Sequence, residues 1–273
     1  MIVSTINELR DKLSYIRKQN KTIGLVPTMG FLHEGHLSLI KRASQETDFV
    51  VVSDFVNPTQ FAPNEDFDSY PRDIKRDYKL AMESGADIIF YPSVEEMYPN
   101  GSSTFVEVTG DITKVLCGQT RPTHFRGVTT VVNMLFNIVN PDKAFFGQKD
   151  AQQAAVLTKM INDTHQDIEL IVCPIIREKD GLAKSSRNTY LNKDEREEAV
   201  LLNKSLSLAK EKFDNGEKNI NTLKQTVVDS INTMPLAKID YVEIYNYPSL
   251  TKIEKINGKF IIAVAVYFGK TRL

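Results

Sequence analysis

The sequence predicts an α/β domain with a mostly parallel sheet, followed by a smaller α+β domain. Short apolar runs, typical of strands covered on both faces, alternate with stretches of helical apolar spacing. This alternation is typical of a parallel sheet covered by helices. The sequence pattern changes after Pro174, where the segments become longer and more charged. We therefore expect a first domain over residues 1–175, and a second, smaller domain over residues 176–273.

The first domain begins with a helix and continues as alternating strands and helices. Helical spacing at the start joins Ile6, Leu9, Leu13 and Ile16. Apolar runs predict strands at Thr22–Val26, Phe49–Phe55, Ile88–Tyr91, Lys143–Phe146 and Ile168–Cys173. Helical patterns cover Leu37–Gln45, Arg72–Ser84, Val128–Val139 and Ala151–Ile161. We expect the strands to be covered on both faces.

The second domain is expected to contain a charged helical region and two strands. Residues 192–212 carry a single apolar stripe, formed by Leu202, Leu206, Ala209 and Phe213. Asn192 and Glu195 have the spacing of a capping box, which predicts a helix start. Strand-like runs follow at Asp240–Tyr245 and Lys259–Phe268.

Composition argues against several classes of partner. Lys and Arg number 34 and Asp and Glu 35, so no global positive field exists to hold a nucleic acid or a membrane surface. The first twelve residues are too charged for a signal peptide, and no apolar run approaches membrane-spanning length. Cys117 and Cys173 make no disulfide framework or ligand cluster. We expect a cytoplasmic protein whose cysteines are thiols.

The most informative segment is residues 27–37, PTMGFLHEGHL, which follows the first predicted strand and opens a helix. Phosphate sites are built at such positions in α/β folds. Gly30 and Gly35 let the backbone approach a ligand. His33 and His36 are three residues apart, so their rings share one side of a helical turn and suit a phosphate whose charge rises during reaction. The alternative is that the histidines only cap the turn.

Competing motifs do not fit this segment. His36 and Leu37 stand where a P-loop requires Lys and Ser or Thr. A dinucleotide G-x-G-x-x-G is absent, since no two glycines are two residues apart. A zinc protease needs histidines four apart, and no cysteine pair completes a zinc site. His124 and His165 are isolated, and we expect His165 to be a surface residue.

The H-x-G-H motif resembles the signature of the nucleotidylyltransferase superfamily and of class I aminoacyl-tRNA synthetases, which act at the α-phosphate of a nucleotide. Within that group, residues 27–33 resemble the pantothenate synthetase (pantoate–β-alanine ligase) family. Further blocks agree in the same order and span nearly the whole chain, at residues 55–61, 70–72, 121–128, 146–153 and 180–188. Several ordered motifs are far more specific than H-x-G-H alone.

This resemblance implies a Rossmann-like domain and the ATP-dependent condensation of (R)-pantoate with β-alanine, through pantoyl adenylate, to pantothenate, AMP and pyrophosphate. It implies a catalytic set of His36, His33, Lys149 and Arg187. It assigns ATP to Met29, Gly30, His33, His36, Gly147, Gln148, Lys149, Asp150, Ile176, Lys184, Ser185, Ser186 and Arg187. It assigns pantoate to Gln60 and Gln153, and β-alanine to Gln60.

The chemistry of these blocks agrees with the assignments. Amides at Asn57 and Gln60 can donate to a carboxylate and accept from hydroxyls, although Asn57-Pro58 can instead be a simple turn. Lys149 supplies a charge for phosphate and Asp150 can cap the next helix; the alternative is a solvated Lys–Asp pair. The loop from Ser185 to Arg187 is rich in donors and suits departing pyrophosphate.

Three further expectations follow. An ATP enzyme of this kind needs Mg²⁺, held mainly by phosphate oxygens, with Asp77 as the acidic residue of interest. The resemblance implies a homodimer. Lys184 departs from the family pattern, in which a hydrophobic residue, most often methionine, is usual, and the sequence leaves the role of its ammonium open.

Two other functions compete with this hypothesis. A nucleotidylyltransferase acting on a phosphate acceptor is compatible with H-x-G-H, but the paired glutamines and the Arg121 block argue against it. A non-catalytic nucleotide- or metal-binding regulator can use the same histidines. Assays of zinc binding and ATP turnover distinguish the second alternative.

Overall fold

The computed structural model describes residues 1–63 and 65–273, which divide into two compact units. The first unit contains Met1–Thr109 and Arg121–Ile175, and the second contains Gly110–Thr120 and Ile176–Leu273. The second unit therefore includes a short segment from the middle of the sequence. Contacts within that unit explain why: the Cys117 Sγ lies 3.2 Å from the Tyr241 hydroxyl, and Arg272 reaches the same sulfur.

The first unit is built on a parallel sheet. Within the described residues it has six strands in the order β1-β4-β3-β2-β5-β6, and all its pairings are parallel. The strands are β1 (Ile2–Val3), β2 (Ile23–Thr28), β3 (Phe49–Asp54), β4 (Ile88–Phe90), β5 (Lys143–Gly147) and β6 (Glu169–Cys173). The chain moves outward from β2 through β3 and β4, then returns to place β5 on the other side of β2. Ligand sites in α/β folds occur at such a reversal.

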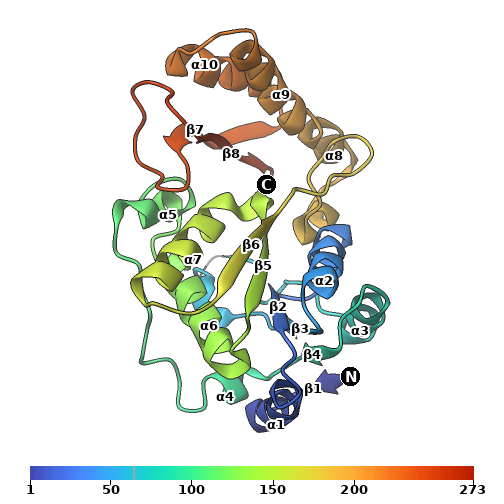
Figure 1. Ribbon diagram of the computed structural model, residues 1–273. Helices are drawn as coiled ribbons and strands as arrows, with labels where there is room; N and C mark the ends of the chain where they lie inside the picture. The colour runs from blue at the N-terminus through green and yellow to red at the C-terminus, as the bar shows by residue number, and fades with distance from the viewer. Residues whose placement is uncertain (64) are drawn as a thin grey trace. The chain divides into compact units, whose positions relative to one another are not determined.

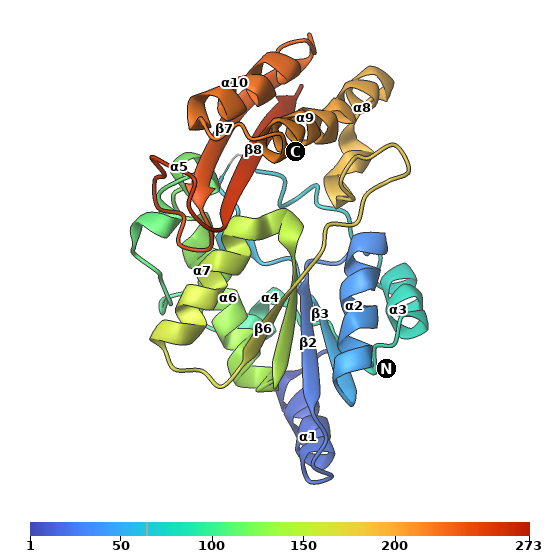
Figure 2. The ribbon, with the colours of Figure 1, turned by 45° about the horizontal axis from the view of Figure 1, so that its top comes forward.

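Helices cover both faces of this sheet (Figure 1, Figure 2). The longer ones are α1 (Ile6–Arg17), α2 (Glu34–Glu46), α3 (Ile74–Glu83), α6 (His124–Val139) and α7 (Ala151–Asp163). Shorter elements are α4 (Val94–Met97) and the 3-10 turns η1 (Pro58–Gln60) and η3 (Gln148–Asp150). Helices α2 and α3 lie on one face, and α6 and α7 on the other.

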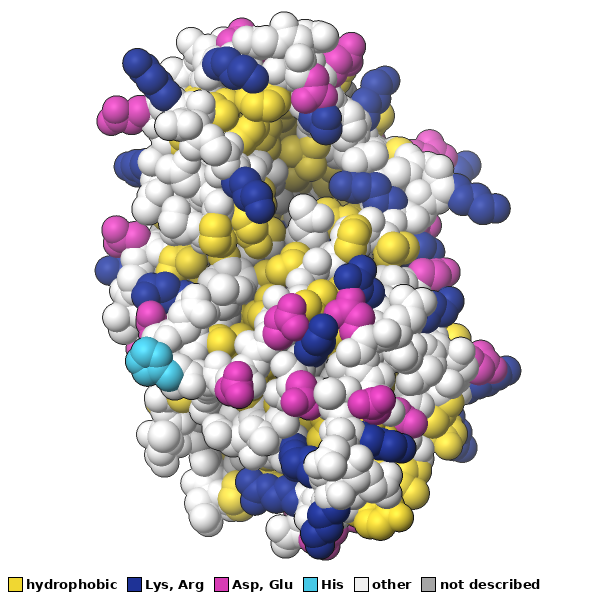
Figure 3. All heavy atoms as spheres, in the orientation of Figure 1, with side chains coloured by type: hydrophobic (Ala, Val, Ile, Leu, Met, Phe, Trp, Pro, Cys, Tyr) yellow, Lys and Arg dark blue, Asp and Glu magenta, His cyan; other side chains and the backbone are white. Residues whose placement is uncertain are grey.

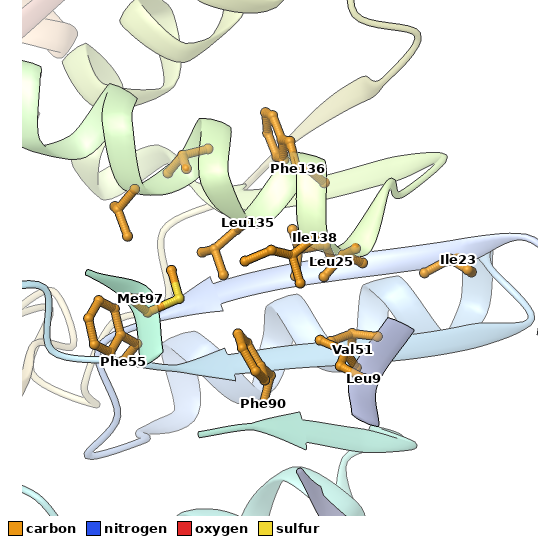
Figure 4. Close-up of a cluster of buried hydrophobic side chains, with 14 of the residues drawn as sticks. Leu9, Ile23, Leu25, Val51, Phe55, Phe90, Met97, Leu135, Phe136 and Ile138 are labelled. Atoms are coloured by element: carbon orange, nitrogen blue, oxygen red, sulfur yellow. The ribbon is translucent and has the colours of Figure 1, made fainter. Parts of the chain in front are cut away.

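Alternate residues of the strands feed two separate apolar cores. On one face, Leu25, Val51 and Phe90 pack with α1 and α6 side chains such as Leu9 and Leu135 (Figure 4). The opposite face combines strand residues with α2 and α3, and its members include Val26, Val50, Val52, Ile89, Leu39, Ile40 and Ala81. This double coverage explains why the strands are nearly continuous apolar runs.

The predicted fold class is confirmed, and most predicted elements of the first unit lie within a few residues of the observed ones. One expectation holds only in part: the run Ile168–Cys173 packs on both faces, through Leu170 on one and Ile171 on the other, but it is incompletely covered. Its strand β6 is at the sheet edge, and the Val172 side chain is 40% exposed. The short strand β1, which pairs with β4, was not predicted.

The second unit contains an antiparallel sheet of β7 (Ala237–Asn246), β8 (Phe260–Phe268) and β9 (Thr271–Arg272). Its helices are α5 (Cys117–Thr120), α8 (Lys193–Ala199), α9 (Leu201–Asp214) and α10 (Ile220–Ile231), with 3-10 turns η2 (Asp111–Thr113) and η4 (Ser186–Tyr190). An apolar core joins α9 and α10 to the sheet through Leu202, Ala209, Val227, Ile231, Val242, Val266 and Phe268.

The predicted helix start at Asn192 is confirmed, because the Asn192 and Glu195 side chains exchange both bonds of a capping box. The charged region is divided into α8 and α9 at Val200. Helix α10 was not predicted. Its apolar residues Leu223, Val227 and Ile231 are at helical spacing and face the core, so the periodic signal was present.

The surface agrees with the balanced composition. On the face drawn in Figure 3, Lys and Arg side chains are interspersed with Asp and Glu. Among the described residues, no helix has the length and apolar character needed to cross a membrane.

Candidate active site

The strand ends of the first unit gather the predicted site residues at one edge of its sheet. Strand β2 leads into the loop Met29–His33, here called the histidine loop. The adjacent strand β3 leads into η1, and β5, on the other side of β2, leads into η3. Because the three strands are parallel, their carboxyl ends lie at the same edge.

The histidine loop turns sharply between β2 and α2. Gly30 has φ +79° and Phe31 has φ +49°, and the Gly30 N–H donates to the Thr28 hydroxyl at 3.1 Å. A side chain at Gly30 would collide with the Asp54 carboxyl group at the end of β3. Glycine is therefore required both for its backbone conformation and for its close approach to Asp54.

Both histidines cap the start of α2, so the capping that was considered as an alternative to phosphate binding does occur. The Gly35 N–H donates to His33 Nδ1 at 3.1 Å, and the His33 N–H donates to His36 Nδ1 at 3.3 Å. An amide can only donate, so both Nδ1 atoms are acceptors and the proton of each neutral ring is on Nε2. Capping thus fixes the tautomer and leaves two Nε2–H donors, on rings stacked 4.0 Å apart.

Electrostatics keep His36 neutral. Burial is the largest cause of a pKa well below the ordinary histidine value, and the nearby His33 and Lys149 lower it further. A neutral imidazole at a helix N-terminus is a hydrogen-bond donor that does not depend on protonation near neutral pH. The pair can therefore bind phosphate oxygens through oriented N–H groups.

Asp77 on α3 anchors the histidine loop. Its carboxylate oxygens accept the Phe31 N–H at 2.6 Å and the Leu32 N–H at 2.7 Å, and Arg76 lies 3.3 Å from it. The Asp77 side chain has no exposed surface. This geometry favours a positioning role over direct ligation of Mg²⁺.

The amide of Gln60 has a fixed orientation. Asn57 Nδ2 donates to Gln60 Oε1 and to the Gly127 carbonyl, each at 3.2 Å, while the Tyr98 hydroxyl donates to Asn57 Oδ1 at 2.7 Å. Gln60 Nε2 is directed to Met29 Sδ at 3.1 Å, so this NH₂ group points toward the histidine loop. Asn57 caps η1 and also orients Gln60, so the turn and functional interpretations of Asn57 are compatible.

The backbone of Gln60 is braced from α6 and the segment before it. His124 Nδ1 donates to the Gln60 carbonyl at 2.9 Å, and burial lowers the His124 pKa to about 4. Arg121 forms a bidentate ion pair with Glu65 and reaches the same carbonyl at 3.5 Å. His124, which we did not predict as a site residue, is therefore a structural support of Gln60.

At the end of β5, Lys149 and Asp150 are exposed and lie 3.8 Å apart. Such pairs contribute at most about 1 kcal/mol, so either charge is readily available to a ligand. Asp150 occupies the N-cap position of α7, but its carboxylate makes no capping bond, contrary to expectation. Gln153 lies in the first turn of α7 and is half-buried.

The remaining predicted residues are in the second unit. Ile176 and Lys184 join the ends of a small hairpin, since the Lys184 N–H donates to the Ile176 carbonyl at 2.9 Å. Gly181 turns this hairpin with φ +99°. Ser185 then caps η4, its hydroxyl accepting the Arg187 N–H at 3.3 Å, and Ser186 is buried.

Besides His124, two supports of the site, Asp54 and Tyr98, were not predicted from the sequence. Asp54 is the acidic end of an apolar run, and that placement was its only signal. Tyr98 contacts Asn57 across 41 residues, for which one sequence gives no signal. Among the described residues, no cluster of three His, Cys, Asp or Glu side chains could hold a metal ion.

Comparison with known proteins agrees with this arrangement. A family model described as pantoate-beta-alanine ligase matches residues 1–273. A protein named pantothenate synthetase from Clostridioides difficile is 56% identical over 273 residues, covering all of this chain and 96% of its own length. One of the same name from Acetivibrio thermocellus is 54% identical over 272 residues, with the same coverage.

Solved structures are similar over the whole chain. The crystal structure of pantothenate synthetase from Thermus thermophilus is 42% identical with a TM-score of 0.95, covering all of this chain and 96% of that one. A pantoate-beta-alanine ligase from Francisella tularensis, complexed with beta-gamma ATP and beta-alanine, is 34% identical with a TM-score of 0.82 and coverage of 100% and 95%.

Proposed function

This chain belongs to the pantoate–β-alanine ligase family, and we propose that its ATP-dependent C–N bond formation uses the histidine loop to bind and activate ATP. The observation that supports this role is the pair of Nδ1 acceptor bonds, which places the ring proton of His33 and of His36 on Nε2, so that each Nε2–H is a donor. The alternative acceptor, a phosphate group, is not favoured, because the family match extends over residues 1–273.

The reaction has two steps. The pantoate carboxylate attacks the α-phosphorus of ATP, and the bond to the bridging oxygen breaks to release pyrophosphate and form pantoyl adenylate. The β-alanine amine then attacks the acyl carbon. The bond between this carbon and the AMP oxygen breaks, AMP leaves with the electron pair of that bond, and the amine nitrogen gives up a proton. The chain needs no nucleophile of its own, so catalysis is positioning and charge stabilisation.

Each group is proposed for the task that its chemistry suits. His36 and His33 donate to the α-phosphate as its charge rises, and Lys149 supplies a positive charge beside them. Met29, Gly30 and residues 147–150 contribute to the ATP site, with Ile176 and Lys184 proposed near the base. Ser185, Ser186 and Arg187 bind the phosphates that depart, and the second domain closes the site.

Gln60 and Gln153 are proposed to bind pantoate. Asn57 holds the Gln60 carbonyl oxygen, so the NH₂ group of Gln60 points toward Met29. An NH₂ group in this position can donate to a carboxylate or a hydroxyl. β-Alanine is proposed to contact the same residue. Gln153 lies in the first turn of α7, which directly follows the η3 turn that carries Lys149, and this is consistent with an acid held beside the phosphate.

We also propose that Mg²⁺ accompanies ATP, bound mainly by phosphate oxygens. The described residues fit this arrangement, because they contain no cage of three ligands and Asp77 is committed to backbone N–H groups. The ion would neutralise phosphate charge. A homodimer and a cytoplasmic location are further proposals, which rest on family resemblance and on the sequence composition.

Isotope exchange tests the proposed function. Pantoate, ATP and Mg²⁺ are expected to support ATP–pyrophosphate exchange without β-alanine, because the adenylate forms first. A panel of small hydroxy acids provides the control, and pantoate is expected to give the highest rate. An absolute requirement for β-alanine in the exchange would exclude the two-step order, and a preference for another acid would exclude pantoate.

A further inference from the structure

A second buried carboxyl group lies against the histidine loop. Asp54 ends β3 and is 4% exposed, and its carboxyl group lies against Gly30, next to the Phe31 N–H that Asp77 accepts. None of the roles proposed above uses it. An acid buried beside another acid is costly unless one of them carries a proton that the other accepts.

The partners of Asp77 decide which acid carries the proton. Both Asp77 oxygens accept short bonds from the Phe31 and Leu32 N–H groups, and Arg76 lies beside it, so Asp77 is the ionised member. Asp54 can join it by a hydrogen bond only as the donor. Burial, and next the charge of Asp77 and the hydrogen bond to it, raise the Asp54 pKa to about 7, which agrees with this assignment.

We propose that Asp54 and Asp77 form a proton-sharing carboxyl pair that positions the histidine loop: Asp54 donates to Asp77, and Asp77 holds the two amides preceding His33. The pair connects β3 and α3 to the turn that starts α2, so it sets where the imidazole donors stand. Neither carboxyl group contacts a reacting atom in this proposal; both act through the backbone of the loop. Only the activity measurement described next rests on the proposed function.

The test compares amide replacements at the two positions. Asp54→Asn retains an N–H donor toward Asp77 and is expected to keep adenylate formation within about threefold of the unmodified protein. Asp54→Ala loses the donor, and Asp77→Asn places an NH₂ group against backbone N–H donors. Both are expected to lower kcat of pyrophosphate exchange by roughly tenfold to a hundredfold, with a smaller change in the KM for ATP. The reason is that the histidine loop shifts and moves the imidazole donors of His33 and His36.

Asp142→Asn is the matched control. The Asp142 carboxylate accepts the Ile23 N–H at 2.6 Å at the opposite end of β2, so this variant removes the charge from a similar backbone contact without disturbing the histidine loop. Its kcat is expected to stay near that of the unmodified protein. Equal losses in Asp54→Asn and Asp54→Ala, or a loss in Asp142→Asn as large as in Asp77→Asn, would overturn the proposal.

NMR of the ligand-free protein separates this inference from the proposed function. The Phe31 and Leu32 amide protons are expected at low field because they donate to a carboxylate, and to move upfield in Asp77→Asn. Asp54→Asn should retain most of their shift and Asp54→Ala should not. Ordinary amide shifts in the unmodified protein would refute the pair, whatever substrate the enzyme uses.

Discussion

The histidine loop and the loop around η4 both carry hydrogen-bond donors, but they are anchored over different distances along the chain. Asp77 holds the histidine loop across 45 and 46 residues. The η4 loop is held locally: Asn188 donates to the Ala183 carbonyl and to Glu178, and Arg196 pairs with Glu178, all within 18 residues.

This difference suggests different mechanical roles. The histidine loop is tied to a strand and to two helices of one core, so it cannot move without disturbing that core. The η4 loop and its hairpin are tied to the second unit, because Leu182 lies in the apolar core of that unit and Arg196 of α8 pairs with Glu178, so they can shift together with that unit. We therefore expect the first loop to act as a fixed donor and the second as a mobile one.

The largest expected effect is at His36. His36→Ala should cost roughly 3–4 kcal/mol of transition-state stabilisation, since it removes a donor to developing charge. His36→Asn retains an acceptor near the Nδ1 position and so should preserve the cap, yet lose similar activity. Single-turnover adenylate formation, with thermal unfolding as the control, checks both. Near-normal turnover in His36→Asn would mean that the histidine is only a cap.

Stability should report the proton on Asp54. The Asp54 pKa is about 7 in the folded protein, whereas an unperturbed aspartate has a pKa of 3.8, so the folded state binds an extra proton between these values. Its contribution to stability is therefore full below pH 3.8 and lost as pH rises through 7. From about pH 5 to about pH 8, the unmodified protein should lose roughly 2–3 kcal/mol more than Asp54→Asn. Parallel denaturation curves for both proteins would contradict the assignment.

Arg187 tests the proposed role of the η4 loop. A guanidinium that binds departing phosphate contributes a charge-assisted hydrogen bond, so Arg187→Ala should slow adenylate formation by roughly 1.5–3 kcal/mol. The η4 cap itself should survive, because it uses the Arg187 N–H. Rapid-quench measurement of adenylate checks this, and an unchanged rate would remove Arg187 from the catalytic set.

Gln60 provides a further test, because it lies in the first unit beside the histidine loop. Gln60→Ala should raise the KM for pantoate by about tenfold or more, and that for ATP less, since a donor to a charged acid is lost. Gln153→Ala should show the same preference. Tyr98→Phe should have a smaller effect, because the Thr59 hydroxyl also donates to Asn57 Oδ1 at 3.0 Å. A larger rise in the KM for ATP would assign these glutamines to the nucleotide.

The sequence predicted local features well and distant ones poorly, for a physical reason. Strands β2 and β3, helix α2 and the capping box of α8 were predicted, because their signals are carried by residues close together in sequence. The sequence also suggested that the histidines cap a turn. It could not show that capping and donation are compatible, because that depends on which ring nitrogen accepts the amide.

Asp77 illustrates what was missed. It was the acidic residue of interest for Mg²⁺, within a predicted helix, whereas folding buries it completely against two amides far away in sequence. Asp54 was hidden inside a predicted strand for the same reason. The edge position of β6 likewise depends on strand order, which local patterns do not contain.

Substitution of Lys184 is expected to give the smallest effect, and it tests whether the mobile loop contributes a side-chain charge to ATP binding. Its N–H is already used within the hairpin, and the ammonium of a half-buried lysine at a mobile loop contributes at most about 1 kcal/mol to an ion pair. Lys184→Met should therefore weaken ATP binding less than about fivefold. Calorimetry measures this, and limited proteolysis with and without a non-hydrolysable ATP analogue reports on the loop itself. We expect cleavage within residues 180–190 to be suppressed by the analogue in both proteins. Equal cleavage with and without the analogue would contradict a mobile loop, and a loss of affinity above about tenfold in Lys184→Met would place its ammonium among the phosphate ligands.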